Sequence, residues 1–167
     1  MKNDNILAFA QNLQTTDKIQ AGGTLVRKVP VRDDLEAVGF CCLGVQSVDL
    51  GFIHVHEGQG CLRLENGHQM PMALAPKALI EWLGFDVPEQ DPEDSQYNIE
   101  VDWDEDLSTP PYASDDGTRY AYTDPDGGID TLAALNDQMK PNMVEHAFTF
   151  AQIGDIVRHF GLKDIRG

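Results

Sequence analysis

The sequence predicts an α+β fold in a single domain over residues 1–167, with about four or five helices packed with short antiparallel hairpins. Apolar residues recur at helical spacing near both ends of the chain, and they alternate with polar residues in short runs along its middle. The 167 residues, 41% of them hydrophobic, suffice to bury one core, so one domain is expected.

The first elements expected are a helix and a strand. Asn3 or Asp4 can cap a helix of about three turns. A strand follows at 24–29, and Pro30 either ends it or marks it as a sheet edge. The helix would bury one stripe, which consists of Ile6, Leu7, Phe9, Ala10 and Leu13.

An apolar run at 41–50 begins with two adjacent thiols, Cys41 and Cys42. Such a run suits either a buried helix or a buried strand. We favour a helix, in which Gly44 admits the close approach of another backbone. Beyond it, 52–56 and 61–64 both alternate around a glycine-rich turn, and this pattern predicts a hairpin.

Two further signals follow this hairpin. Asn66-Gly67 marks a second turn. Pro76 stands where a helix can begin, and Gly84 stands where that helix would end.

An acidic β insertion is expected at about 86–128. Positions 86–126 contain 14 of the 28 acidic residues and one basic residue, Arg119. Within this segment, 97–103 and 118–122 alternate and contain aromatic residues, which a disordered acidic linker would lack. They predict two strands, which are candidates to pair with each other.

Two helices are expected after the insertion. The first is short and capped, over 130–137. The second covers 150–160, where Thr149 caps it, one face is apolar, and Gly161 ends it.

The formal net charge of −16 excludes several classes of partner. Phosphate groups would be repelled, so we expect no direct nucleic-acid binding and no anionic membrane surface. The N-terminus does not resemble a signal peptide, and no run approaches the roughly 20 apolar residues of a membrane span. Three cysteines, an odd number, fit reduced thiols in a cytoplasm. The charge suits a basic protein partner, bound cations or imitation of a nucleic acid.

Cysteine and histidine residues are the first candidates for chemistry. Cys41 or Cys42 as nucleophile, with His54 or His56 as base, would make a small hydrolase-like enzyme. A helix N-terminus near Cys41 would help to lower the pKa of its thiol. The alternative is that these thiols are buried as small apolar side chains, and their apolar neighbours favour that interpretation.

Zinc and calcium are the two cofactors that the sequence leaves open, although we expect none. Zinc would use His54, His56 and Cys61, but it needs about four ligands and no Cys-x-x-Cys pair occurs. The carboxylates of Asp124 and Asp126 resemble the start of a calcium loop, but that loop's later ligands are missing. A capped turn into the next helix explains the second pattern better.

Binding residues are expected in three places. Asn136 and Asp137 could line a pocket or hydrogen-bond a neighbouring loop. Arg27, Lys28 and Arg63 could meet an anionic ligand or pair with local carboxylates. In the acidic insertion, the expected contact residues are Asp102, Trp103, Asp104, Glu105 and Asp106. The P-loop, Gly-x-Gly-x-x-Gly, Gly-x-Ser-x-Gly and His-Glu-x-x-His motifs do not occur, which disfavours the common nucleotide-dependent and hydrolase classes.

Several short motifs follow one another over nearly the whole chain. They are Cys-Cys-Leu-Gly-Val at 41–45, Trp-Leu-Gly at 82–84, Leu-Asn-Asp at 135–137 and the helix at 150–156. In this order they resemble a group of small, mostly uncharacterised proteins of tailed bacteriophages and prophages. This chain departs from that pattern in its acidic insertion and its His-Val-His hairpin. The resemblance implies a phage origin and expression in the bacterial cytoplasm as an accessory protein.

We therefore expect a phage-type accessory protein, and first of all a non-enzymatic binder that neutralises a host factor. It would imitate nucleic acid toward a host protein with a basic surface, or sequester a small signalling molecule near Cys41 and Asn136. The alternatives are a small enzyme with a Cys/His or zinc site, and a virion or assembly component.

Overall fold

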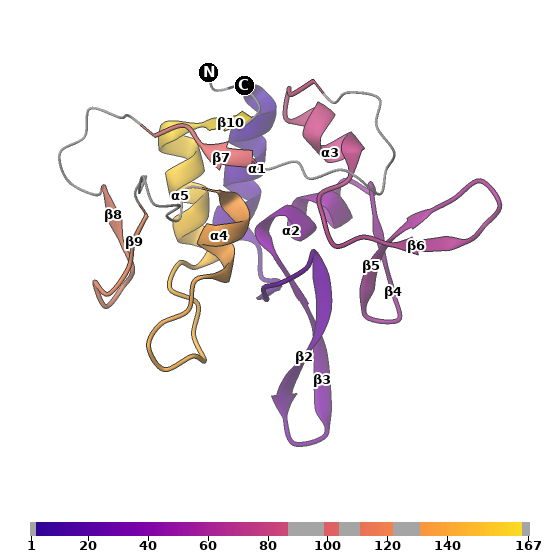
Figure 1. Cartoon of the computed structure of the whole chain (residues 1–167), viewed down its shortest axis with the longest axis horizontal. Coiled ribbons are helices and arrows are strands. Elements are labelled where there is room, and N and C mark those ends of the chain that lie inside the picture. Colours follow the sequence, from indigo (N-terminus) through magenta and orange to yellow (C-terminus); the bar gives the residue numbers. More distant parts are fainter. Residues whose placement is uncertain (1–2, 87–98, 104–110, 122–130, 165–167) are drawn as a thin grey trace. The chain divides into compact units, whose positions relative to one another are not determined.

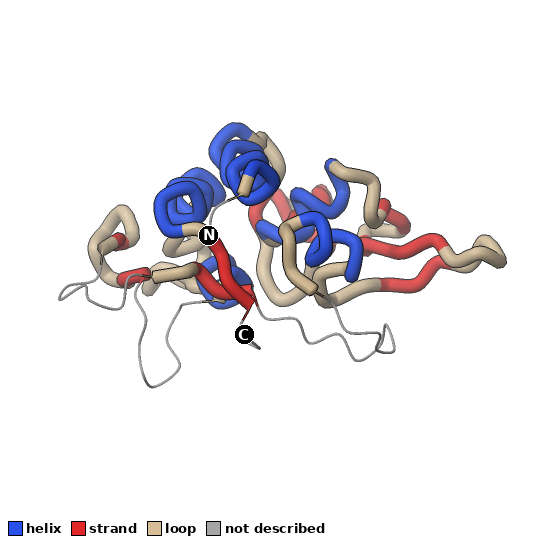
Figure 2. The backbone as a smooth tube through the Cα atoms, turned by 90° about the horizontal axis from the view of Figure 1, so that it is seen from above, coloured by secondary structure: helices blue, strands red, loops and turns tan. Residues whose placement is uncertain are grey.

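The computed structural model describes residues 3–86, 99–103, 111–121 and 131–164. The chain divides into two compact units: unit 1 comprises Met1–Thr16 and Asn98–Gly167, and unit 2 comprises Asp17–Tyr97. Helices occur beside short strands, which Figure 2 colours blue and red. The strands form small separate sheets and are mostly antiparallel. The predicted α+β class is confirmed. None of the helices in the described ranges is both long and apolar enough to cross a membrane.

Unit 1 is built on two helices from opposite ends of the chain, α1 (Asp4–Thr15) and α5 (Phe150–Phe160). They pack side by side (Figure 1). Gly154 permits this approach, because a Cβ at that position would lie 2.6 Å from the carbonyl oxygen of Ala10. Both helices begin and end as predicted, since each carries its own capping residues. The Asn3 side chain accepts a hydrogen bond from the Ile6 N–H, and Gly161 ends α5 at a φ of 82°.

The capping box at the N-terminus of α5 leads to a first testable prediction. The Thr149 hydroxyl accepts from the Gln152 N–H at 3.2 Å, and Gln152 Oε1 accepts from the Thr149 N–H at 2.9 Å. Replacing Thr149 with alanine removes half of this capping box and is expected to lower the free energy of unfolding by about 1 kcal/mol. Thr149→Ser should restore most of it. Urea denaturation measures both variants; equal losses in the two would contradict the assigned role of the hydroxyl.

The remaining elements of unit 1 are one short helix and two pairs of strands. The predicted short capped helix at 130–137 is α4 (Leu132–Asp137), and its cap is Thr131. Strand β7 (Ile99–Val101) pairs with β10 (Leu162–Asp164), and β8 (Tyr112–Ala113) pairs with β9 (Tyr120–Ala121), both antiparallel. The suggestion that the two alternating segments of the insertion pair with each other is therefore wrong. Each finds a different partner, because strand pairing depends on what lies beside a strand.

Unit 2 contains two three-stranded sheets. In the first, the order is β1 (Ile19–Gln20), β3 (Leu35–Phe40), β2 (Val26–Arg32). In the second, the order is β4 (His54–His56), β5 (Gln59–Arg63), β6 (Gln69–Pro71). The predicted strand at 24–29 lies at a sheet edge, as Pro30 indicated, and the predicted hairpin is β4–β5. Strand β3 was not predicted, because its residues, Leu-Glu-Ala-Val-Gly-Phe at 35–40, do not alternate between apolar and polar.

The helices of unit 2 follow the sequence signals closely. The run at 41–50 forms α2 (Cys42–Asp49), and a Cβ on Gly44 would lie 2.0 Å from the carbonyl oxygen of Leu25. The predicted close approach of another backbone is thus confirmed. Helix α3 (Lys77–Trp82) follows Pro76 and ends at Gly84, whose φ is 99°. The Gly84 and Phe85 N–H groups donate to Glu81 and Ile80, which closes a Schellman motif.

Candidate functional site

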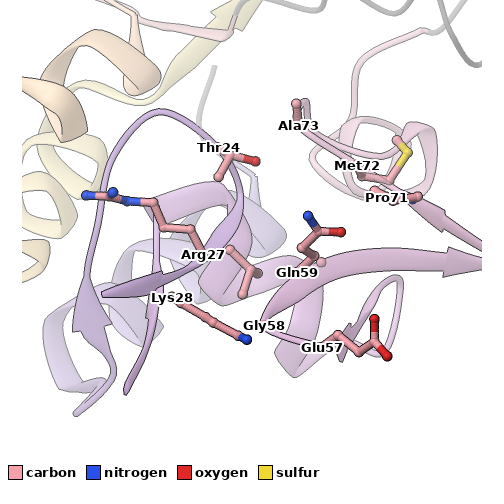
Figure 3. Close-up of a pocket in the computed structure, with 11 residues that line it drawn as sticks. Thr24, Arg27, Lys28, Glu57, Gly58, Gln59, Pro71, Met72 and Ala73 are labelled. Carbon is pink, nitrogen blue, oxygen red and sulfur yellow. The ribbon is translucent and has the colours of Figure 1, made fainter. Parts of the chain in front are cut away.

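The main candidate site is a groove in unit 2 that we call the β2 groove. Its volume is about 520 Å³, within the range of ligand-binding pockets. One wall comes from β2 and the residues before it, and the other from the β4–β5 turn and the end of β6 (Figure 3). The lining residues are Thr24, Val26, Arg27, Lys28, Glu57, Gly58, Gln59, Gly60, Pro71, Met72 and Ala73.

Two glycines set the width of this groove. A Cβ on Gly60 would lie 3.0 Å from a methyl carbon of Val26, and one on Gly58 would lie 2.5 Å from Cγ of Lys28. The side chains of Val26 and Lys28 therefore run directly against β5 and its turn. Glu57 and Gly58 both have positive φ, 52° and 77°, as a two-residue hairpin turn requires. The turn thus presents a flat glycine surface to the Lys28 side chain.

Arg27 and Lys28 are neighbours that point in different directions. Figure 3 shows the Lys28 ammonium beside Gly58, whereas the Arg27 guanidinium points away from Gln59 and Met72. The ion pairs between described residues involve Lys18, Lys77, Lys140 and Lys163 and include neither Arg27, Lys28 nor Arg63. The three cations that the sequence suggested as anion contacts are therefore not paired with a described carboxylate.

The opposite wall was not predicted. Glu57, Gln59 and Met72 add a carboxylate, an amide and a thioether to this wall, and Thr24 adds a hydroxyl to the first wall. The predicted hairpin placed 58–60 in the turn between its strands, whereas the turn is formed by Glu57 and Gly58, and Gln59 begins β5. Only the packing of β5 against β2, which neither strand's own pattern encodes, brings these side chains to Lys28.

The three cysteines differ in exposure. Cys42 and Cys61 are buried, as the apolar run suggested, whereas Cys41 is half-buried and forms the N-cap of α2. Its Sγ accepts from the Gly44 N–H at 3.3 Å. Burial, with a smaller contribution from Glu57, raises the pKa of the Cys61 thiol. The run is therefore not buried throughout, because its first thiol serves as a cap.

These exposures predict the order of thiol alkylation. Iodoacetamide should label Cys41 first, because that thiol is accessible and lies at a helix N-terminus. Cys42 and Cys61 should react only after unfolding. Peptide mass spectrometry of the native protein measures this, with Cys41→Ser as the matched control that keeps a capping side chain. Rapid native labelling of Cys42 or Cys61 would contradict the assignment.

The histidines of β4 lie near one cysteine. His54 is directly opposite Cys61 in the β4–β5 ladder, and the His54 and His56 ring centroids are 6.5 Å apart. No group of three or more His, Cys, Asp or Glu side chains that could hold a metal ion occurs in the described ranges. His54 and Arg63 instead line a smaller cavity of about 310 Å³, and His54 Nε2 is buried without a hydrogen-bond partner among the described atoms.

Asn136 and Asp137 belong to unit 1. Asn136 is fully buried, and its amide donates to Oδ1 of Asp137 at 3.1 Å. The Asn136 carbonyl oxygen lies 2.6 Å from Nδ1 of His146. These bonds fit the interpretation in which the pair hydrogen-bonds a neighbouring loop. Cys41 belongs to unit 2 and lines neither of the two cavities described above, and Asn136 lines neither of them.

The acidic insertion is described in two pieces, and Asp104, Glu105, Asp106 and the calcium-like loop lie outside the described residues. In the first piece, Trp103 is 4% exposed and packs on Phe160 at a centroid distance of 4.6 Å, so it is a core residue. Beside it, the Asp102 N–H donates to the Gly161 carbonyl at 3.0 Å.

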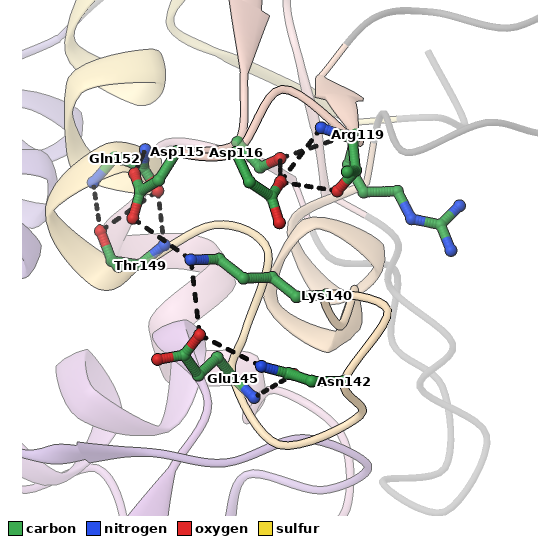
Figure 4. A network of polar contacts seen from close by, with 10 residues as sticks. Asp115, Asp116, Arg119, Lys140, Asn142, Glu145, Thr149 and Gln152 are labelled. Carbon is green, nitrogen blue, oxygen red and sulfur yellow. Dashed lines mark hydrogen bonds and ion pairs between the residues drawn. The ribbon is translucent and has the colours of Figure 1, made fainter.

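The second piece, the β8–β9 hairpin, is anchored to unit 1 by polar contacts (Figure 4). Asp115 accepts from the Gln152 amide at 2.7 Å and lies 3.6 Å from the Lys140 ammonium. Lys140 also lies 3.6 Å from Glu145. The two described pieces of the insertion are thus held to the helices of unit 1.

The hydrogen bonds of Asp116 predict that the turn around it is sensitive to acid. It accepts from the hydroxyl and N–H of Thr118 and from the hydroxyl of Ser114, and these bonds lower its pKa to about 2. A depressed carboxyl pKa stabilises the fold above the unfolded value of 3.8, and this contribution is lost as the pH falls through about 2. Nuclear magnetic resonance titration should show the Ser114 and Thr118 resonances shifting with that midpoint. Asp116→Asn should remove the shift; an unchanged titration would refute it.

Comparisons with family models, with curated proteins and with solved structures found no match to this chain.

Proposed function

We propose that this protein is a non-enzymatic accessory binder, of the kind that bacteriophages encode, and that it neutralises a host protein with a basic surface in the bacterial cytoplasm. The distribution of charge along the sequence is the main observation that supports this proposal. Positions 86–126 hold 14 acidic residues against one basic residue, so the other 126 residues, with 14 acidic and 11 basic, are close to balance. Charge concentrated in one segment of about 40 residues suits imitation of a nucleic acid toward a basic groove.

The described pieces of this segment support the proposal. β7 pairs with β10, and the β8–β9 hairpin is joined to Lys140 and Gln152. A segment anchored in this way loses less conformational entropy on binding than a free acidic tail would lose. Asp115 and Asp116 already form hydrogen bonds within the protein. The other carboxylates of the segment would therefore contact the partner, and Asp104, Glu105 and Asp106 are the densest run among them.

The test compares two neutralised variants in host lysate. One carries Asp104→Asn, Glu105→Gln and Asp106→Asn. Its matched control carries Asp33→Asn, Asp34→Asn and Glu36→Gln, three changes of the same kind at the β2–β3 turn. We expect wild type and control to capture the same nucleic-acid-binding protein, with capture falling steeply from about 50 mM to about 500 mM salt. The insertion variant should capture at least about tenfold less.

Two outcomes would refute the proposal. One is equal capture by the two variants, and the other is capture that salt does not weaken. The captured protein must also lose its nucleic acid when this protein is added, since imitation requires competition for one surface.

Sequestration of a small signalling molecule is the second candidate. The volume of the β2 groove, about 520 Å³, is the observation that favours it. Mass spectrometry of the denatured, freshly purified protein should then release a nucleotide-sized molecule in about equimolar amount. A clean spectrum from protein expressed in infected host cells would remove this candidate.

A further inference from the structure

The β2 groove runs along an open strand edge. Strand β2 is the outer strand of its sheet, so one side of its backbone is paired with β3 and the other side faces outward. In an antiparallel ladder, alternate residues bond inward and the residues between them bond outward. The identity of the outward residues decides what the groove offers to a ligand.

The hydrogen bonds on either side of β3 determine this alternation. The Phe40 carbonyl accepts from the Ala21 N–H at 2.8 Å, on the side of β3 away from β2. Val26 is opposite Phe40, so Val26 does not bond inward. Next to it, the Leu25 carbonyl accepts from the Cys41 N–H at 3.0 Å, as an inward residue does.

Val26, Lys28 and Pro30 therefore direct their backbone groups outward. Pro30 agrees with this assignment, because proline has no N–H and suits an edge position. No hydrogen bond between described residues involves the outward N–H of Val26 or of Lys28. Val26 is only 2% exposed, so its outward groups are enclosed, whereas Lys28 is exposed and its outward N–H and carbonyl line the groove.

We propose that the β2 groove binds an extended segment of a partner protein as a fourth strand beside β2, with an acidic side chain next to Lys28. An extended peptide supplies the alternating donors and acceptors that an open edge requires, which few small molecules do. The Lys28 ammonium, which has no described carboxylate partner, provides the charge complementarity.

The remaining lining fits the same occupant. Gln59 offers an amide to the far side of an added strand, and the half-buried Met72 offers apolar surface to its side chains. Strand β2 begins at Val26 and Pro30 has no N–H, so Lys28 supplies the exposed outward N–H of the stretch Val26–Pro30. This site is separate in sequence from the acidic insertion and does not rest on the proposed function.

The test uses a displayed library of random twelve-residue peptides selected on the full-length protein. We expect the selected peptides to combine β-branched residues with one Asp or Glu. The best of them, made synthetically, should lose about tenfold or more in affinity for the Lys28→Glu variant. Arg32→Glu is the matched control: it makes the same charge change on the same strand, at an exposed residue that does not line the groove, and affinity should stay within about twofold.

A second pair of variants tests the backbone. Lys28→Pro removes the outward N–H at a position of the same kind as Pro30, so the β2–β3 ladder is retained. Lys28→Gln removes the same charge but keeps the N–H. We expect the proline variant to bind the peptide about fivefold more weakly than the glutamine variant, which is the loss of one hydrogen bond. Circular dichroism confirms that both variants are folded.

Three results would overturn the proposal. The first is a selection that yields no peptide above background, and the second is equal affinity of the Lys28→Pro and Lys28→Gln variants. The third is a small molecule that co-purifies with the protein and blocks the groove. The variant neutralised at positions 104–106 should bind the peptide like wild type, so failure of the charge-imitation proposal leaves this result unaffected.

Discussion

Replacing Gly44 with alanine is expected to lower the free energy of unfolding by about 3 kcal/mol or more, which is a large fraction of the stability of a typical domain. The added Cβ would lie 2.0 Å from the Leu25 carbonyl oxygen and 2.8 Å from its carbon. These are backbone atoms at the base of β2, so no flexible side chain can move aside. Either α2 shifts, or the hydrogen bond from Cys41 to Leu25 breaks.

Urea denaturation measures this loss, and hydrogen exchange locates it. Exchange should rise in α2 and in the β2–β3 hairpin, both of which belong to unit 2. Gly67→Ala is the control, because a Cβ there meets nothing within 4 Å and Gly67 differs only by its φ of 82°. That control should cost about 1 kcal/mol from backbone strain alone. A Gly44→Ala loss no larger than the control's would show that the close approach is not needed.

The second large effect is expected at Gly154, in the middle of α5. Alanine favours a helix over glycine by about 1 kcal/mol, so helix propensity alone predicts stabilisation. The close packing of α5 on α1 predicts a loss of stability instead, because the new Cβ would lie 2.6 Å from the Ala10 carbonyl oxygen and 2.8 Å from Cγ of Gln14. We expect contact to dominate and the Gly154→Ala variant to lose about 2 kcal/mol.

The test is therefore whether the Gly154→Ala substitution lowers or raises the free energy of unfolding. Ala151→Gly, on the exposed side of the same helix, calibrates propensity and should cost about 1 kcal/mol. Hydrogen exchange in the Gly154→Ala variant should rise in α1 and α5. A stabilised Gly154→Ala variant would mean that the two helices are not in close contact.

Helix boundaries could be predicted because their causes are local. Asn3, Thr131 and Thr149 lie within three residues of the N–H groups that they cap, so a short stretch of sequence contains the whole interaction. The same holds for Gly84 and Gly161 at helix ends. Strands β3, β6 and β10 were missed because their pairing partners lie elsewhere in the chain and their own patterns are weak.

In the candidate site too, some features could be predicted from the sequence and others depend on contacts between distant residues. The sequence marked Arg27, Lys28 and Arg63 as unusual cations in an acidic chain, and the structure leaves all three without a described carboxylate partner. It could not say that the Lys28 ammonium lies beside Gly58 while the Arg27 guanidinium points away from Gln59 and Met72. That choice follows from the face of β2 that packs on Gly58 and Gly60, and a shift of one residue would exchange the two.

Four features follow from the amino-acid sequence alone: the α+β class, the positions of most helix caps, the requirement for glycine at 44, and the concentration of charge between 86 and 126. Each of these is a property of one residue type or of a few neighbours. The three-dimensional packing was needed to show which strands pair, that Cys41 caps a helix while Trp103 is buried, and that β2 has an open edge beside Lys28. Those outcomes depend on contacts between residues far apart in the chain, and the free energy of such contacts belongs to the pair and not to either residue alone.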